Sequence, residues 1–272
     1  MSAMYNRFRA LGAFVYTAQN LTDDQLHRFA WAGGKWICPV IYGDDAAGPW
    51  NVANLTKLQN RANSIGLEVA GWFNVTNDKP SGQDATAIAK IVKNYHLPLV
   101  ILDAELQYQY PASGCQVLPT LLQQVRAQLP NIDLMLSSLG PNNAYIYNGR
   151  TLAPPKSMYD LGWRHAPQWY SSYYARDGRT PQERMKWMKA NASTDFNIRD
   201  STAPNSRGLP LSYIHPTTEA TGLEGSNLAQ ECLDIKASKA FGFTAGISYY
   251  TLENGPPSDM NILRSYKGVL FD

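Results

Sequence analysis

The sequence lacks the features of several common classes of protein. Lysine and arginine total 24 against 22 acidic residues, for a net charge of +2, and the basic residues are scattered rather than gathered in a stripe that would follow a nucleic-acid backbone. No apolar run approaches the roughly 18 residues that span a bilayer, and the first residues do not form a secretory signal. We therefore expect no nucleic-acid and no membrane partner, and synthesis in the cytoplasm without Sec export.

Residues of metal, thiol and serine chemistry are also sparse. The three cysteines, Cys38, Cys115 and Cys232, are odd in number, lie far apart and show no CxxC spacing, so neither a disulfide framework nor a zinc site is indicated. The four histidines are scattered without an HExxH motif, and His215 is interpreted as structural. A G-x-S-x-G motif and a Gly-rich phosphate loop are both missing. We expect no metal and no cofactor, and a metal- or phosphate-dependent enzyme has little support.

What the sequence does contain is a repeating alternation of strand-like and helix-like segments. Short apolar, β-branched or aromatic runs alternate with longer stretches of helical period. This pattern predicts an α/β protein, a single (β/α)8 TIM barrel over residues 1–272, since such barrels need about 250 residues. An open doubly wound sheet is the alternative, but its Gly-rich loop is absent. The eight predicted strands begin at Leu11, Trp36, Leu67, Leu97, Ile132, Ala166, Leu209 and Phe243.

The intervening helices carry local start and stop signals. Thr22 is a predicted N-cap with Gln25 at the capping-box position, and glycines 33, 66 and 242 follow predicted helix ends. The fifth helix must be short, around residues 157–161. The other predicted helices cover residues 54–64, 83–95, 119–128, 181–190, 227–241 and 258–266.

The clearest candidate for chemistry is a pair of acids after the fourth predicted strand. Asp103 and Glu105 follow a fully apolar stretch, and side chains two apart on a strand share a face. Active residues of such barrels come from the carboxyl ends of strands. Two close carboxyl groups in a partly dry pocket cannot both ionise freely, so one should keep its proton, as glycoside hydrolysis requires. The alternative is a solvated acid pair at the start of a loop.

Three short motifs resemble a known family. LDAE at 102–105 resembles the D-x-E signature of the family 25 glycoside hydrolases, the lysozyme-type muramidases, and more distantly the end of the family 18 chitinase motif. GWFN at 71–74 is similar to the muramidase G-x-Y-H-F segment, and QWY at 168–170 with Tyr173 is similar to their strand-six tryptophan and tyrosine. The resemblance implies that Glu105 is the general acid and that Asp103 orients a substrate acetamido group or stabilises positive charge on the sugar.

The sequence also departs from that family. The muramidases carry an acid near the end of strand one, where this chain has Tyr16, Thr17 and Gln19, and Glu253 is the nearest counterpart of their strand-eight Asp. Asp44 and Asp45 follow the second strand, where a Gly-Asp-Asp-Ala stretch is typical of a turn. Aromatic and polar side chains near strand ends suit a sugar cleft. The candidate substrate-binding residues are Tyr16, Trp72, Asn74, Trp169, Tyr170, Tyr249, Tyr250 and Glu253.

Two functional hypotheses follow. The first is a glycoside-hydrolase-like barrel that acts on or binds the N-acetylated polysaccharide of cell walls, peptidoglycan above all, as a bacteriophage lysin or a virion-associated tail protein. The second is a non-catalytic barrel, a structural or receptor-binding component of a phage tail whose partners are other phage structural proteins. The vacant acid position on strand one favours the second hypothesis, and the strand-four acid pair favours the first.

Overall fold

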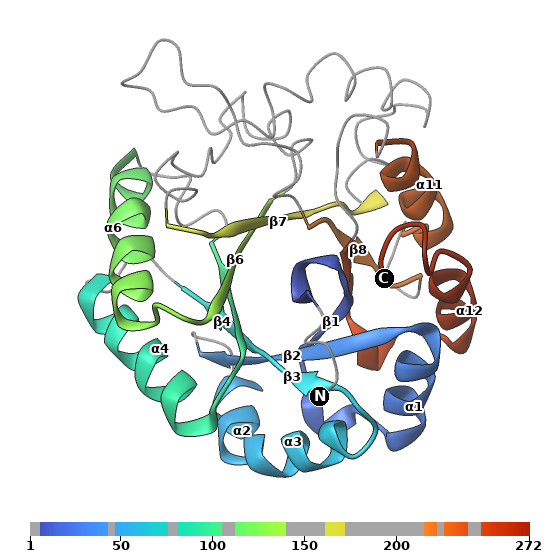
Figure 1. Ribbon diagram of the computed structural model, residues 1–272, viewed down its shortest axis with the longest axis horizontal. Helices are drawn as coiled ribbons and strands as arrows, with labels where there is room; N and C mark the ends of the chain where they lie inside the picture. Colours follow the sequence, from blue (N-terminus) through green and yellow to red (C-terminus); the bar gives the residue numbers. More distant parts are fainter. Residues whose placement is uncertain are drawn as a thin grey trace.

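The chain folds into a closed barrel of parallel strands. The computed structural model describes residues 6–42, 47–75, 81–104, 112–139, 161–171, 215–221, 226–238 and 246–272. All strand pairings are parallel, and β1 pairs with both β2 and β9, which closes the sheet on itself (Figure 1). The strands are β1 (Leu11–Val15), β2 (Gly34–Tyr42), β3 (Glu68–Val69), β4 (Gly71–Asn74), β5 (Leu99–Asp103), β6 (Asp133–Leu139), β7 (Arg164–Gln168), β8 (Thr217–Glu219) and β9 (Ile247–Tyr250).

The sheet amounts to eight positions around the barrel. Strands β3 and β4 are separated only by Ala70, and both pair with β2, so they form one wall together. The predicted (β/α)8 barrel is therefore confirmed, and the open doubly wound alternative fails because the first and last strands are hydrogen-bonded neighbours.

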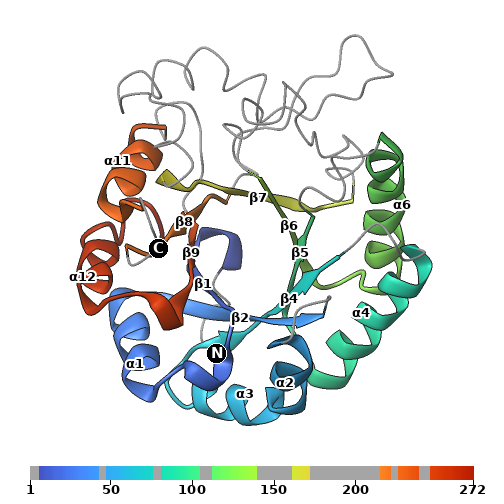
Figure 2. The same ribbon diagram turned by 180° about the vertical axis from the view of Figure 1, so that it is seen from behind.

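The described helices lie on the outside of the barrel (Figures 1 and 2). The first of them has the predicted capping box, with Thr22 and Gln25 bonded reciprocally, and ends at Gly33 in the left-handed conformation. The described α-helices are α1 (Asp23–Ala32), α2 (Ala47–Ala53), α3 (Leu55–Asn63), α4 (Ser81–Tyr95), α6 (Ala112–Gln128), α11 (Leu228–Ser238) and α12 (Pro257–Ser265), with 3-10 turns η1 (Arg7–Arg9), η2 (Ala18–Asn20) and η5 (Leu252–Asn254).

Some element boundaries differ from those predicted. Helix α6 begins at Ala112 instead of residue 119, and β8 begins at Thr217, where the predicted strand ended. The residues from Leu209 to 214 lie outside the described residues, as do the predicted helix at 181–190, most of the one at 157–161, and Gly242. No described helix is long and apolar enough to cross a membrane.

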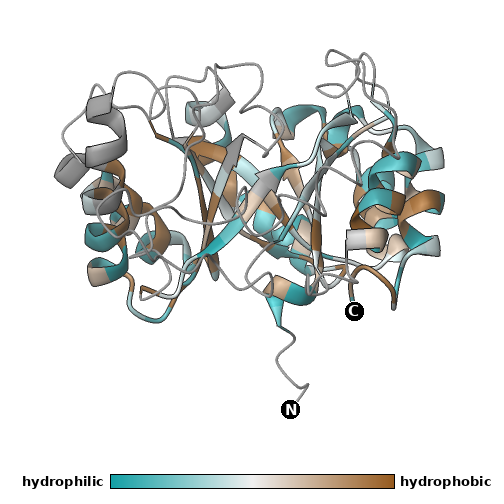
Figure 3. Cartoon of the chain, turned by 90° about the horizontal axis from the view of Figure 1, so that it is seen from above, coloured by the Kyte–Doolittle hydropathy of each residue, from teal (hydrophilic) through white to brown (hydrophobic). Residues whose placement is uncertain are grey.

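The core has two layers, one on each face of the strands. The outer layer packs between strands and helices, and the inner one fills the barrel with side chains that include Phe14, Trp36, Trp72 and Met135. Gly12 is required here, because a Cβ at this position would lie 2.0 Å from the Trp36 ring. Figure 3 shows the barrel from the side, with hydrophobic residues along the inner strands and hydrophilic ones alternating along the helices.

The amino end of the barrel is closed by polar groups. Arg7 is buried there and pairs with Glu68 at 2.6 Å and with Asp133 at 3.0 Å. His215, also buried, contacts the Phe8 carbonyl and the Ser248 hydroxyl through its two ring nitrogens. The interior therefore opens toward the carboxyl ends of the strands, as is usual in this fold.

Candidate active site

A pocket of about 220 Å³ lies at the carboxyl end of the barrel. Strand β1 and each strand from β4 to β9 contribute one lining residue, and Tyr170 just beyond β7 adds another. The site is therefore assembled by seven strands and by no single segment. The lining residues are Phe14, Trp72, Asp103, Ser137, Gln168, Tyr170, Glu219 and Tyr250.

Asp103 is the last residue of β5, and its carboxylate is held in place by a neighbouring strand. The side chain is only 4% exposed, and the Trp72 indole N–H donates a hydrogen bond to its Oδ2 at 3.1 Å. A hydrogen bond to an ionised group is stronger than one between neutral partners, so it fixes the direction of the carboxylate. Burial raises the pKa of the nearby Cys38 thiol, and the charge of Asp103 adds to that rise. Cys38 is therefore a packing residue and not a nucleophile.

Three of the other predicted acids lie outside the described residues. These are Glu105, Asp44 and Asp45, and Tyr173 lies outside them as well. Asp103 is thus the one member of the expected acid pair among the described residues, and it lines the pocket. The role of Glu105 stays a prediction from the sequence.

Aromatic side chains form much of the pocket wall and its rim. The Trp72 ring meets Phe14 edge-on at 5.2 Å and Tyr250 at 6.0 Å, while Tyr170 stacks on Tyr250 at 5.6 Å. Tyr16 lies at the rim, 41% exposed, with its ring 6.3 Å from that of Trp72. Of the predicted substrate-binding residues, Trp72, Tyr170 and Tyr250 line the pocket and Tyr16 stands beside it.

Trp169 and Tyr249 lie elsewhere, which corrects the expectation that they line the cleft. Both belong to the outer core layer, and the Tyr249 hydroxyl donates to Asp259 on α12 at 2.5 Å. Successive side chains along a strand point to opposite faces, so a residue near a strand end faces either the barrel interior or the helices. Their neighbours Gln168 and Tyr250 occupy the inward positions instead.

Asn74 and Glu253 are also absent from the pocket lining. Asn74 ends β4 and is half-buried. Glu253, in η5, accepts backbone N–H groups of Tyr16 at 2.6 Å and Thr17 at 2.7 Å through one oxygen. Burial raises the pKa of Glu253, and the N–H donors of Thr17 and Tyr16 oppose that rise. This acid therefore fixes the loop after β1, which differs from the substrate contact we expected of it.

Sequence reasoning missed a second carboxylate in the pocket, that of Glu219. It ends β8 and is 6% exposed. Its backbone N–H donates to Oε2 of the buried Glu231 at 2.7 Å, and the Ser171 N–H donates to Oε1 at 2.5 Å. Burial raises the pKa of Glu231 to about 8. An acid after the β-branched pair Thr217-Thr218 is the signal that would have indicated Glu219, because Asp103 also follows directly on a buried strand.

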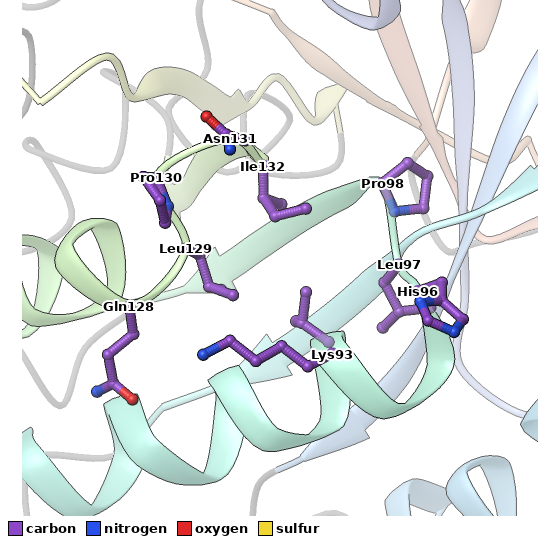
Figure 4. A pocket seen from close by; sticks show the side chains of 10 residues that line it. Lys93, His96, Leu97, Pro98, Gln128, Leu129, Pro130, Asn131 and Ile132 are labelled. Atoms are coloured by element: carbon purple, nitrogen blue, oxygen red, sulfur yellow. The ribbon is translucent and has the colours of Figure 1, made fainter.

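A second cavity lies elsewhere and has a different character. It measures about 540 Å³, and Figure 4 shows it between the end of α4 and the segment that leads into β6. Leu97, Leu129 and Ile132 give it apolar walls, and Lys93 extends across it. A lysine in the last turn of a helix offsets the negative end of the helix dipole, which accounts for Lys93 without a ligand. Among the described residues, no group of three or more His, Cys, Asp or Glu is arranged to hold a metal ion.

Comparisons with known proteins identify the fold. No protein-family model and no curated protein matches the sequence. Solved structures do match, beginning with a GH18 chitinase from Pseudoalteromonas aurantia, with a TM-score of 0.65 and 15% identity over 96% of this chain and 100% of that one.

Two further matches cover nearly the whole chain. Active domain 2 of a thermostable chitinase from Pyrococcus furiosus, complexed with chito-oligosaccharides, matches with a TM-score of 0.62 and 12% identity over 96% of this chain and 95% of that one. A β-mannanase from the blue mussel Mytilus edulis matches with a TM-score of 0.53 and 8% identity over 95% and 92%. At these identities the likeness shows the fold: this chain is a (β/α)8 barrel of the kind found in glycoside hydrolases.

Proposed function

We propose that this chain is a carbohydrate-active barrel that binds a polysaccharide at the carboxyl-end pocket and hydrolyses its glycosidic bonds. The observation that carries the proposal is the pocket itself, where the buried, oriented carboxylate of Asp103 lies among Trp72, Tyr170 and Tyr250. Sugars are held by aromatic faces and by polar groups that bond to their hydroxyls, and this pocket offers both.

The chemistry assigned to the site divides between two acids. Glu105 gives its proton to the oxygen of the leaving sugar, and Asp103 carries the negative charge that balances the positive charge on the ring. The Trp72 indole N–H keeps Asp103 in one orientation, so that no reorganisation is needed as this charge develops. Ser137 and Gln168 supply hydrogen-bonding groups for the sugar hydroxyls.

The substrate class proposed is an N-acetylated polysaccharide. An acetamido N–H is a good donor to a fixed carboxylate such as Asp103. Two of the three matching structures described above are chitinases, one of them complexed with chito-oligosaccharides, and this supports the choice of class. The finer assignments to a muramidase, to peptidoglycan and to a phage lysin rest on the sequence resemblance, and they are part of the proposal on that basis.

The test measures hydrolysis of chitin oligomers and of peptidoglycan by wild type, Glu105→Gln and Asp103→Asn. The Gln side chain keeps the size of Glu105 but has no proton to transfer, so the rate should fall by roughly 10² to 10⁴ while binding survives. The exposed Asp24 provides the matched control, because Asp24→Asn changes the same group on α1. Equal rates for wild type and Glu105→Gln would contradict the proposal.

A non-catalytic barrel is the second candidate, and one observation favours it. Glu253, the expected counterpart of a muramidase acid, is engaged by the backbone of Tyr16 and Thr17, and the end of β1 offers no acid of its own. Such a barrel would keep the pocket for binding, for instance as a receptor-binding component of a phage tail. A folded wild type that binds oligosaccharides but hydrolyses none of them would establish this second function.

A further inference from the structure

The described parts of β7 and β8 are joined by the shortest ladder in the sheet. The two strands share one register pair, Gln168 with Thr217, whereas β6 and β7 share five. Just past this pair, the Trp169 N–H donates to the Thr217 carbonyl at 2.7 Å. The pocket residues Tyr170 and Glu219 lie beyond this short ladder, toward the carboxyl end. Their spacing therefore depends on other contacts.

A buried side chain from the helix layer bridges the ends of the two strands. Glu231 lies in the first turn of α11, beside the carboxyl ends of β7 and β8 (Figures 1 and 2). Its Oε1 accepts the Ser171 N–H at 2.5 Å, and its Oε2 accepts the Glu219 N–H at 2.7 Å. Ser171 directly follows Tyr170, so one carboxyl group holds the backbone at Glu219 and next to Tyr170.

These two backbone segments carry one wall of the pocket. Tyr170 stacks on Tyr250 with ring centroids 5.6 Å apart, and Glu219 is the register partner of Tyr250 on β9. All three residues line the pocket. A change in the spacing of β7 and β8 would therefore move Tyr170 relative to the other two residues, and the shape of the wall would change with it.

We propose that Glu231 is a positioning residue of the saccharide pocket, which fixes the spacing between the ends of β7 and β8 and so the place of Tyr170 beside Glu219 and Tyr250. This inference rests on the proposed function, since it concerns the same saccharide site. A carboxyl group suits this role because it offers one acceptor oxygen to each strand end. A glutamine cannot replace it fully, because its NH2 group would face one of the two N–H donors.

The proton of Glu231 gives this role a signature in the pH dependence of binding. Burial raises the pKa of Glu231 to about 8, and the charge of Glu219 adds to that rise. Ionisation above this pH places a charge in a buried site, and opening the ends of β7 and β8 to water relieves its cost. A ligand that binds only the closed pocket should therefore bind about tenfold more weakly at pH 9 than at pH 7.

The neighbours of Glu231 do not produce the same signature. Burial raises the pKa of the Tyr249 hydroxyl on β9 and of the Cys232 thiol on α11, so both keep their protons between pH 6 and pH 9. The charges of Glu231 and, on α12, of Asp259 add to both rises. A change in affinity centred near pH 8 is thus assigned to Glu231.

The experiment measures the affinity for chitohexaose by calorimetry from pH 6 to pH 9 in wild type and Glu231→Gln. At pH 7 the variant should bind about 2- to 12-fold more weakly, which is the range of one lost hydrogen bond. Its affinity should then stay level up to pH 9, while that of wild type falls. The variant should fold, because the Asn227 N–H donates to the Ser171 hydroxyl at 2.5 Å and gives the start of α11 a second anchor.

The matched control is Asp259→Asn, which changes another buried acid of the helix layer to its amide. A single oxygen of Asp259, Oδ2, accepts both the Thr221 N–H at 2.9 Å and the Tyr249 hydroxyl at 2.5 Å. An amide oxygen in the same place keeps both bonds. This variant should therefore bind chitohexaose as wild type does, with the same decline above pH 8.

Two results would overturn the inference. One is a folded Glu231→Gln protein that keeps the wild-type affinity and its decline above pH 8, and the other is an equal loss of affinity in Asp259→Asn. If wild type binds no oligosaccharide, the proposed function fails, and amide hydrogen exchange decides the role of Glu231. The amide of Ser171 or of Glu219 should then exchange about tenfold faster in Glu231→Gln, and unchanged exchange at both would show that Glu231 does not fix these strand ends.

Discussion

Replacing Glu231 by Gln should change how stability depends on pH, because this buried acid joins the strand ends that carry the pocket. Burial raises its pKa from 4.5 to about 8. At about 1.4 kcal/mol for each pKa unit, the difference in the pKa of Glu231 between the folded and unfolded states amounts to about 5 kcal/mol of stability. The folded state holds the proton more tightly than the unfolded state, so this contribution is fully present below pH 4.5 and is lost as the pH rises through 8.

The Gln variant has the same shape but cannot ionise. Its amide oxygen accepts only one of the two N–H groups of Ser171 and Glu219, so it should lose about 2 kcal/mol at low pH. By pH 9 wild type should have lost about 5 kcal/mol and the variant none of it, which leaves the variant about 3 kcal/mol more stable. Urea unfolding at a series of pH values, followed by tryptophan fluorescence, measures both curves. Two curves that stay parallel from pH 4.5 to 9 would refute the reasoning.

Three further substitutions test the barrel interior and the loops. Burial lowers the pKa of His215 to about 4, so the unfolded state takes up a proton before the folded state as the pH falls. The free energy of unfolding of wild type relative to His215→Gln should therefore fall by roughly 3 kcal/mol between pH 6.5 and pH 4. A difference in the free energy of unfolding by urea that stays constant over this range would contradict the prediction. Gly246→Ala should lower the unfolding midpoint severely, because its Cβ would lie 2.0 Å from the Phe8 carbonyl oxygen and the residue has a φ of +124°. Gly66→Ala, at a φ of +80° with open space around it, should lower the free energy of unfolding by only about 1 kcal/mol. Equal losses for the two alanines would show that the backbone contact is unimportant.

Local signals in the sequence predicted the elements well. The Thr22 and Gln25 capping box and the left-handed Gly33 are set by residues a few positions apart, and such signals can be read without knowing the fold. The barrel followed from the number and alternation of strands, because eight such units can bury their apolar faces by closing on themselves.

The sequence did not predict as well which way individual side chains point. Trp169 and Tyr249 stand one position from inward-facing residues, and the phase of a strand is fixed only by its register with neighbours that are distant in sequence. Glu219 was missed because β8 begins where the predicted strand ended. Its place in the same pocket as Asp103 depends on the closure of the whole barrel, which brings residues more than a hundred positions apart into one pocket lining.

The central claim is that the carboxyl-end pocket is a saccharide site, and the indole N–H of Trp72 reports on it directly. This proton is bonded to Asp103 within the pocket, so its NMR resonance should shift when chitohexaose is added at millimolar concentration. The indole resonance of Trp31, which lies on α1 and is 50% exposed, should stay in place as an internal control. A shift of the Trp72 resonance that saturates with the oligosaccharide is the predicted result. A Trp72 resonance unmoved by both chitohexaose and peptidoglycan fragments, in a folded protein, would contradict the account.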